Sequence, residues 1–133
     1  MKRLKHLLAV AAVFACSDPF QPTVENVIGD YTARTFTVTD STGTTDLLNA
    51  GATFTLSLGP RGTAVGYLYI PAISGDSEVV ADMAGTWTLW QGIILLNQTA
   101  DTFVRDLAFF AGDRQLYADK IFPSARVKVI LTK

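Results

Sequence analysis

Cysteine and histidine are almost absent from this chain of 133 residues, with Cys16 the only cysteine and His6 the only histidine. A single cysteine excludes an intrachain disulfide, so the fold depends on packing and hydrogen bonding. His6 lies in an N-terminal segment that we expect to be removed, which leaves no imidazole for a Ser–His or Cys–His pair or for zinc. We therefore expect a protein that is not an enzyme, with no cofactor and no metal.

The chain also lacks a hydrophobic run long enough to cross a membrane as a helix. Its N-terminus has a basic start at residues 2–6 and an apolar run at residues 7–15, far short of the ~20 residues that a span needs. This arrangement is typical of a cleaved signal peptide, here residues 1–15. Residues 13–16 (VFAC) resemble the lipobox of bacterial lipoproteins, which implies that Cys16 is lipidated. Ordinary cleavage after Ala15 is the alternative.

There is no excess of basic residues. Loss of Lys2, Arg3 and Lys5 from the 11 basic residues leaves 8 against 12 acidic residues, a formal charge of −4. This balance argues against a nucleic-acid partner, which would need a basic face. The expected membrane contact is the lipid anchor on Cys16. Ser17 differs from the inner-membrane retention signal of enteric bacteria, so we expect the outer membrane, with the protein facing the periplasm.

Residues 16–28 contain Pro19 and Pro22 and predict a tether, and residues 29–133 predict one all-β domain. Only residues 45–50 have a helical pattern. Alternation over short segments predicts an up-and-down antiparallel barrel of about eight strands, with a β-sandwich as the alternative. A change of apolar phase near Arg34 predicts a bulge. The expected strands are residues 30–39, 52–58, 63–70, 78–83, 85–90, 93–98, 102–110, 114–122 and 124–133.

Three features resemble bacterial lipocalin-like lipoproteins, which are small calycin-type barrels. Gly29-Asp30-Tyr31 is similar to the G-x-W motif at the first strand, residues 41–51 are expected to form a longer loop or short helix before the second strand, and residues 85–89 read GTWTL. The resemblance implies a barrel that binds a small apolar or amphipathic ligand. It also implies a basic residue of the last strand stacked on the ring of Tyr31. Arg126 would be that residue, although it is out of phase with Val127, Val129 and Leu131.

Arg105 is the most informative charged residue. Alternation over residues 102–110 places it in phase with Phe103 and Leu107, inside the barrel. A guanidinium there must be paired or stacked on an aromatic ring. One hypothesis is that Arg105 meets the anionic head group of a bound amphiphile. The other is a structural role, in which it closes one end of the barrel against Trp87 or Tyr31.

The candidate ligand-binding residues are apolar, aromatic or, in one case, basic, and all are expected to point inward. An eight-stranded barrel is near the size at which side chains either fill the interior or leave room for one small ligand, and the sequence leaves both cases open. Carboxylate pairs such as Asp101 and Asp106 are expected to cap turns rather than catalyse. The candidates are Phe54, Leu56, Tyr67, Trp87, Leu89, Phe103, Arg105, Leu107 and Phe109.

Residues 93–96 (IILL) are apolar on both faces of a predicted strand, and Trp90 precedes them. Only one face of this strand can point into a barrel. The other face is covered by the chain itself or meets a partner. The alternative function is therefore a structural or protein-interaction lipoprotein with a filled core, whose partner binds at Trp90, Ile94 and Leu96.

Overall fold

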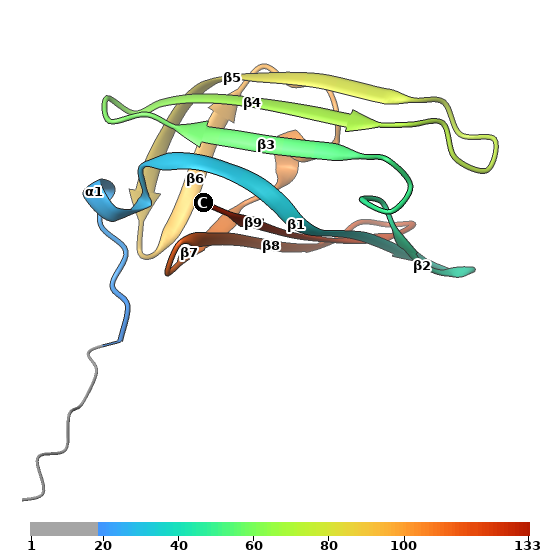
Figure 1. Cartoon of the computed structure of the whole chain (residues 1–133), viewed down its shortest axis with the longest axis horizontal. Coiled ribbons are helices and arrows are strands. Elements are labelled where there is room, and N and C mark those ends of the chain that lie inside the picture. The colour runs from blue at the N-terminus through green and yellow to red at the C-terminus, as the bar shows by residue number, and fades with distance from the viewer. Residues whose placement is uncertain (1–18) are drawn as a thin grey trace, which may run out of the picture.

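The computed structural model describes residues 19–133 and is built almost entirely from antiparallel strands (Figure 1). The order of the sheet is β2-β1-β3-β4-β5-β6-β7-β8-β9, with a further pairing between β1 and β9. The elements are α1 (Val24–Val27), β1 (Gly29–Asp40), β2 (Gly43–Asp46), β3 (Thr53–Leu58), β4 (Thr63–Ile70), β5 (Val79–Trp90), β6 (Ile93–Gln98), η1 (Phe103–Asp106), β7 (Phe109–Gly112), β8 (Gln115–Ile121) and β9 (Arg126–Thr132).

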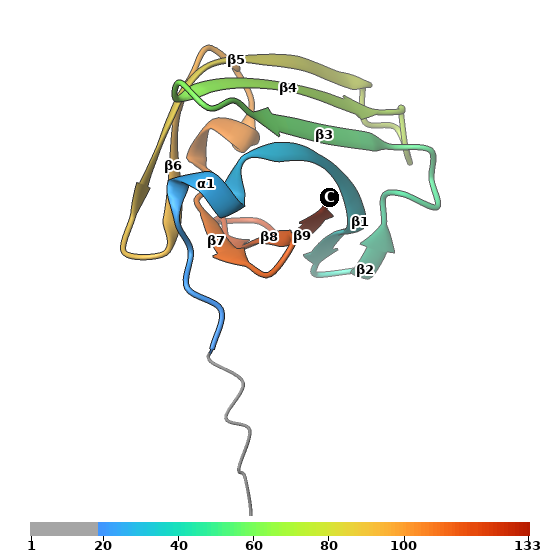
Figure 2. The same ribbon diagram turned by 60° about the vertical axis from the view of Figure 1, so that its left-hand side comes forward.

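The β1–β9 pairing closes eight strands into a barrel, and β2 is an additional strand on the edge of β1 (Figure 2). The predicted eight-stranded barrel is therefore confirmed, and the sandwich alternative is wrong. The closed antiparallel barrel is consistent with a calycin-like fold. Closure removes most free strand edges, which suits a chain without a disulfide.

The barrel has two different ends, which we name the tether end and the mouth. At the tether end, α1 lies beside the short turns that join β3 to β4, β5 to β6 and β7 to β8 (Figure 1). The mouth holds the β1–β2 turn and the longer connections at residues 47–52, 71–78 and 99–108.

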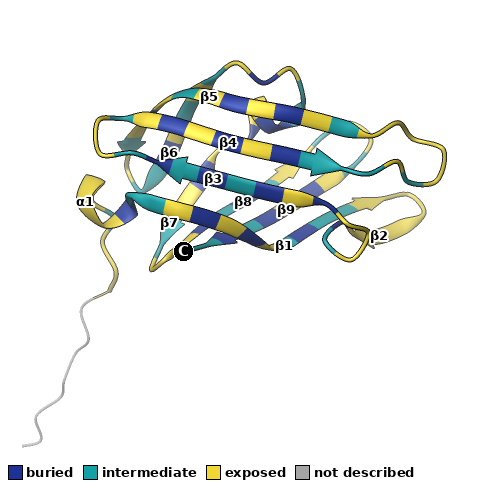
Figure 3. Ribbon diagram, turned by 45° about the horizontal axis from the view of Figure 1, so that its top comes forward, coloured by how far each residue is buried: buried dark blue, intermediate teal, exposed yellow. Residues whose placement is uncertain are grey.

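Alternating burial along the strands defines the core (Figure 3). In β3, Phe54, Leu56 and Leu58 are buried while the residues between them are not, as the period of two for a strand requires. Aromatic rings meet across the interior, with centroids 5.6 Å apart for Phe36 and Phe54 and 6.3 Å apart for Phe54 and Phe109. The interior is filled by side chains.

Two of the strands, β1 and β5, have irregular pairing. The register of β1 against β9 shifts between Ala33 and Thr35, which confirms the expected bulge. The two strands expected at residues 78–83 and 85–90 are instead one strand, β5, which pairs first with β4 and then with β6. At Gly85 the backbone of β6 approaches so closely that a Cβ would collide with the Asn97 carbonyl.

Two predicted segments are corrected. Residues 45–50 are not helical, because Thr45 and Asp46 belong to β2 and residues 47–50 form a turn. Residues 102–110 are not a continuous strand, because residues 103–106 form the 3₁₀-helix η1 and only residues 109 and 110 join β7. The strand period therefore does not apply to Arg105.

The tether end is closed by the first and last parts of the domain. The Tyr31 hydroxyl donates to the carbonyl of Val27 at 2.7 Å, and burial raises the pKa of that hydroxyl. Lys133 Nζ lies 5.4 Å from the centre of the Tyr31 ring and donates to the carbonyls of Asn26 and Ile28. The expected basic residue against Tyr31 is thus Lys133, and the assignment to Arg126 is wrong.

The predicted signal peptide (residues 1–15) and the predicted lipidation site, Cys16, lie outside the described residues. Within residues 19–133, no helix is long and apolar enough to cross a membrane.

Candidate ligand-binding site at the mouth

Most of the predicted ligand-binding residues are parts of the packed core. Phe54, Leu56, Trp87, Leu107 and Phe109 are each at most 4% exposed. Trp87 also donates from Nε1 to the carbonyl of Gly59 at 2.9 Å, so its polar atom is satisfied within the protein. The prediction that these five side chains point inward is confirmed, although Leu107 follows η1 and does not lie in a strand. Their contacts with one another account for their burial.

Two of the predicted residues point outward. Tyr67 is 41% exposed on the outer face of β4, because the inward positions beside it are Gly66 and Leu68. The Arg105 side chain is 58% exposed in η1, with Nη1 3.9 Å from Asp101 Oδ1. The prediction of an inward Arg105 is therefore wrong, and so are both roles proposed for it inside the barrel.

The remaining two predicted residues are half-buried at opposite ends of the barrel. Phe103 packs against Phe36 and Phe122, with ring centroids 6.4 and 6.2 Å away, and so covers part of the core at the mouth. Leu89 lines a recess of about 300 Å³ at the tether end together with Trp87, Thr88, Gly62 and Val24. None of the nine predicted residues lines the groove described next.

A groove opens at the mouth because β1 and β3 pair over only four residues. Their register runs from Gly29–Leu58 to Thr32–Thr55, after which β1 pairs with β2 instead. Leu47 fills the resulting gap, where its backbone N–H donates to the carbonyl of Phe36 and its carbonyl accepts from Ala52. Leu47 therefore closes the barrel wall below the groove, while the rim above it stays open.

The mouth groove has a volume of about 280 Å³ and an apolar floor under a polar rim. The floor continues the barrel interior, because Val38 and Ile70 lie two residues beyond the buried Phe36 and Leu68 on the same strand faces. The rim consists of hydroxyl and carboxylate side chains. The floor residues are Val38, Leu47, Ile70, Pro71, Ile73 and Val79, and the rim residues are Asp40, Thr42, Thr45, Ser74, Asp76 and Ser77.

The rim carries negative charge at neutral pH. Thr42 donates to Asp40 Oδ1 from Oγ1 at 2.6 Å and from its backbone N–H at 2.8 Å. These two hydrogen bonds lower the pKa of the Asp40 carboxyl below its ordinary value, and the bond from the Thr42 side chain has the larger effect. The groove is therefore suited to an apolar group with a neutral or cationic head, and repels an anionic one.

Sequence analysis missed this groove because its walls come from segments that are far apart in the chain. Val38 and Val79 could have been noted as apolar residues at strand ends. The loop signals at Pro71 and Gly75 could have marked the mouth. Nothing in the sequence states that these ends meet around one opening.

The residues of the predicted protein contact, Trp90, Ile94 and Leu96, differ in how far they are exposed. Trp90 is 57% exposed, but Ile94 is fully buried and Leu96 is half-buried. The outward residues of β6 are Ile93 and Leu95, one position out of phase with the expected pair. The apolar surface at this strand is thus real and uses different residues.

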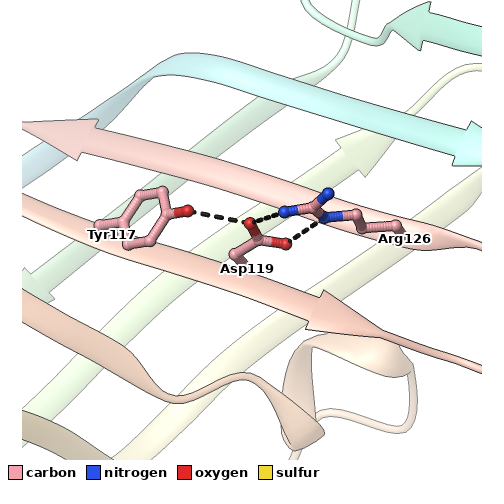
Figure 4. A network of polar contacts seen from close by, with 3 residues as sticks. All are labelled: Tyr117, Asp119 and Arg126. Atoms are coloured by element: carbon pink, nitrogen blue, oxygen red, sulfur yellow. Dashed lines mark hydrogen bonds and ion pairs between the residues drawn. The ribbon is translucent and has the colours of Figure 1, made fainter.

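A polar network on the outer face of β8 and β9 is structural in character (Figure 4). Arg126 donates to both carboxylate oxygens of Asp119 at 2.7 and 2.5 Å, and the Tyr117 hydroxyl donates to the same carboxylate at 2.9 Å. Each polar group in it has a partner on the same wall. Within residues 19–133, no cluster of three or more Asp, Glu, His or Cys side chains could hold a metal ion.

No family model, curated protein or solved structure matches the chain.

Proposed function

We propose that this protein is a lipid-anchored protein of the bacterial cell envelope, related to the lipocalin-like lipoproteins, whose barrel binds a small apolar or amphipathic ligand without catalysis. The observation that carries the proposal is the mouth groove, with its apolar floor and its rim of hydroxyls and carboxylates. Ligand sites of this kind are concave and mostly apolar, with a few polar groups that orient the ligand. The anchor is Cys16, as its lipobox-like context indicates.

The filled core moves the proposed site from the barrel interior to its rim. Phe36, Phe54 and Phe109 occupy the volume in which a ligand would otherwise lie. A groove of about 280 Å³ accepts a short apolar group and leaves the head of an amphiphile at the rim. The Asp40 carboxylate favours a cationic head over an anionic one.

The neighbouring residues Val79 and Val80 allow a matched test. Val79 faces the groove, whereas Val80 is 51% exposed on the outer face of the same strand. Val79→Asp should weaken binding of the neutral fluorescent probe N-phenyl-1-naphthylamine at least about tenfold, roughly 1.4 kcal/mol, because it places a charge on the apolar floor. Val80→Asp should change the affinity less than about twofold.

The same titration identifies the preferred head group. Dodecyltrimethylammonium should displace the probe at lower concentration than dodecyl sulfate, since the rim is anionic. Equal loss of probe binding in both valine variants would contradict the groove as the site, and so would a wild-type protein that does not bind the probe.

The filled core also favours a second candidate, a structural or protein-interaction lipoprotein. Its contact would use the outward apolar residues near Trp90 rather than the groove. In that case the probe would not bind at the mouth, and substitution of Val79 would have no effect on the interaction.

A further inference from the structure

Three apolar side chains and Tyr117, whose hydroxyl donates to Asp119, form a row across adjacent strands on the outside of the barrel. Trp90 of β5 lies opposite Ile93 of β6, Ile93 opposite Phe110 of β7, and Phe110 opposite Tyr117 of β8. Directly paired residues point to the same face of a sheet, so these four side chains, which we name the outer row, are neighbours. Trp90 is 57% exposed and Phe110 53% exposed.

The outer row lies beside the tether. Trp90 and Ile93 flank the two-residue turn Gln91-Gly92, and a Cβ on Gly92 would lie 3.8 Å from the ring of Pro22. The backbone N–H of Ala111, next to Phe110, donates to the carbonyl of Gly92 at 2.8 Å. In Figures 1 and 2, α1 and the chain that leads into it lie at the same end of the barrel as the β5–β6 turn.

We infer that the outer row is a membrane-docking surface, on which the barrel rests against the lipid bilayer. This inference rests on the proposed lipid anchor at Cys16. Cys16 comes six positions before Pro22, so the attachment point is at most ~20 Å from Pro22, which lies against the β5–β6 turn. A tether of that length lets the row reach the bilayer surface, where tryptophan and other aromatic side chains are favoured.

A second apolar group on the outside of the barrel does not share this location. Val65, Tyr67 and Val80 are also exposed, but they lie on β4 and the first half of β5, not beside the β5–β6 turn that Pro22 contacts. Proximity to the anchor therefore distinguishes the outer row.

The charge distribution favours the same orientation. The mouth, at the opposite end, has six carboxylates in and beside its connections. Its basic residues are Arg105, Lys120 and Arg126, the last of which is paired with Asp119, so an anionic lipid surface repels this end. These carboxylates are Asp40, Asp46, Asp76, Glu78, Asp101 and Asp106.

The two tryptophans of the chain report on docking separately. Trp87 is buried in the core and Trp90 belongs to the outer row. The test uses the full acylated chain in phosphatidylethanolamine–phosphatidylglycerol vesicles whose acyl chains carry bromine, a fluorescence quencher. Trp90 emission should shift to shorter wavelength and be mostly quenched, while the Trp90→Phe variant, which retains Trp87, should be little affected.

Two further variants provide matched controls. Phe110→Ser should reduce the quenching of Trp90, because it removes a neighbouring apolar contact with lipid. The double variant Val65→Ser, Val80→Ser should leave it unchanged. Because the Trp90→Phe variant retains Trp87, the difference between the wild-type and Trp90→Phe spectra gives the Trp90 emission.

Failure of the anchor and failure of docking give different results. Protein that is acylated and membrane-bound, but whose Trp90 is not quenched, overturns the docking surface and leaves the anchor intact. A Trp90 shift that depends on protein concentration rather than on lipid also overturns it, in favour of contact between copies of the chain. If mass spectrometry shows Cys16 unmodified, the anchor fails, and addition of the same protein to preformed vesicles still decides docking, with quenching of Trp90 in support and its absence against.

Discussion

Asp119 lies at the centre of the polar network on the outer wall, and its bonds to Arg126 hold the pKa of its carboxyl at about 2, against an ordinary value of 3.8. Because the pKa of the folded state is the lower one, the ionised carboxylate stabilises the fold. That contribution is fully present above pH 3.8, and is lost as the pH falls towards 2.

Replacement of Asp119 by Asn should therefore have an effect that depends on pH. At pH 7 we expect the melting temperature to fall by about 2–4 °C, because an ion pair whose arginine side chain is 57% exposed contributes modestly. The difference from wild type should narrow between pH 4 and pH 2, measured by circular dichroism. Asp82→Asn, at an exposed carboxylate on β5, serves as the control, and a difference for Asp119→Asn that stays constant down to pH 2 would refute the assignment.

Single side chains were predictable where the strand period holds and not elsewhere. The alternation of Phe54, Leu56 and Leu58 correctly identified the inward face of β3. The prediction that Tyr67 points inward was wrong because the inward position is its neighbour Gly66, where a Cβ would come within 2.9 Å of the Thr55 carbonyl. The core accepts only a small residue at that point, so the larger side chain lies outside.

At the scale of the element, β5 is one strand that passes from pairing with β4 to pairing with β6, and Gly85 is the residue at which this happens. The sequence pattern instead predicted a break at residue 84 and a second strand that begins at this glycine. The physical reason for the glycine is different, because β6 lies too close for any side chain.

Gly85→Ala tests that reason. The added Cβ meets backbone atoms of Asn97 and Gln98 rather than a flexible side chain, so β5 and β6 must separate. We expect the free energy of unfolding to fall by about 2–4 kcal/mol in urea denaturation. Ala84→Thr, at the exposed neighbouring position, should stay within about 0.5 kcal/mol of wild type, and a similarly small change in Gly85→Ala would show that the strands can yield.

The prediction of one strand over residues 102–110 was also wrong. Their apolar residues match a strand, yet only the last two join one, since β7 and β6 share just two residue pairs. The rest forms η1, where Gln98 Nε2 donates to the carbonyl of Val104 at 3.1 Å. A period of two cannot distinguish a strand from a short 3₁₀ segment that covers a gap.

For the whole molecule, barrel closure could be predicted from the number and spacing of strands, but its uneven seams could not. β1 meets β3 over four residue pairs and β6 meets β7 over two, whereas β4 and β5 share eight. These registers depend on contacts between distant segments. The mouth groove arises at the first of these seams.

The seam between β6 and β7 should be a weak point of the barrel. Beyond Ile94, alternate backbone N–H groups of β6 face this seam, those of Leu96 and Gln98, while those of Leu95 and Asn97 face β5. By hydrogen exchange followed with NMR, we expect the Leu96 and Gln98 amides to exchange at least about tenfold faster than their two neighbours. Equal protection of all four amides would show that η1 shields the gap between β6 and β7 from water as well as a paired strand does.

The two ends of the described chain meet at one end of the barrel, where Lys133 holds the carbonyls of Asn26 and Ile28. β1 spans the distance from there to the mouth with twelve residues. In the anchored protein proposed here, the opening of the groove thus looks out into the aqueous compartment. A ligand would arrive from solution, without first dissolving in the bilayer, and a fusion added after Lys133 would crowd the lipid side while leaving the entrance free.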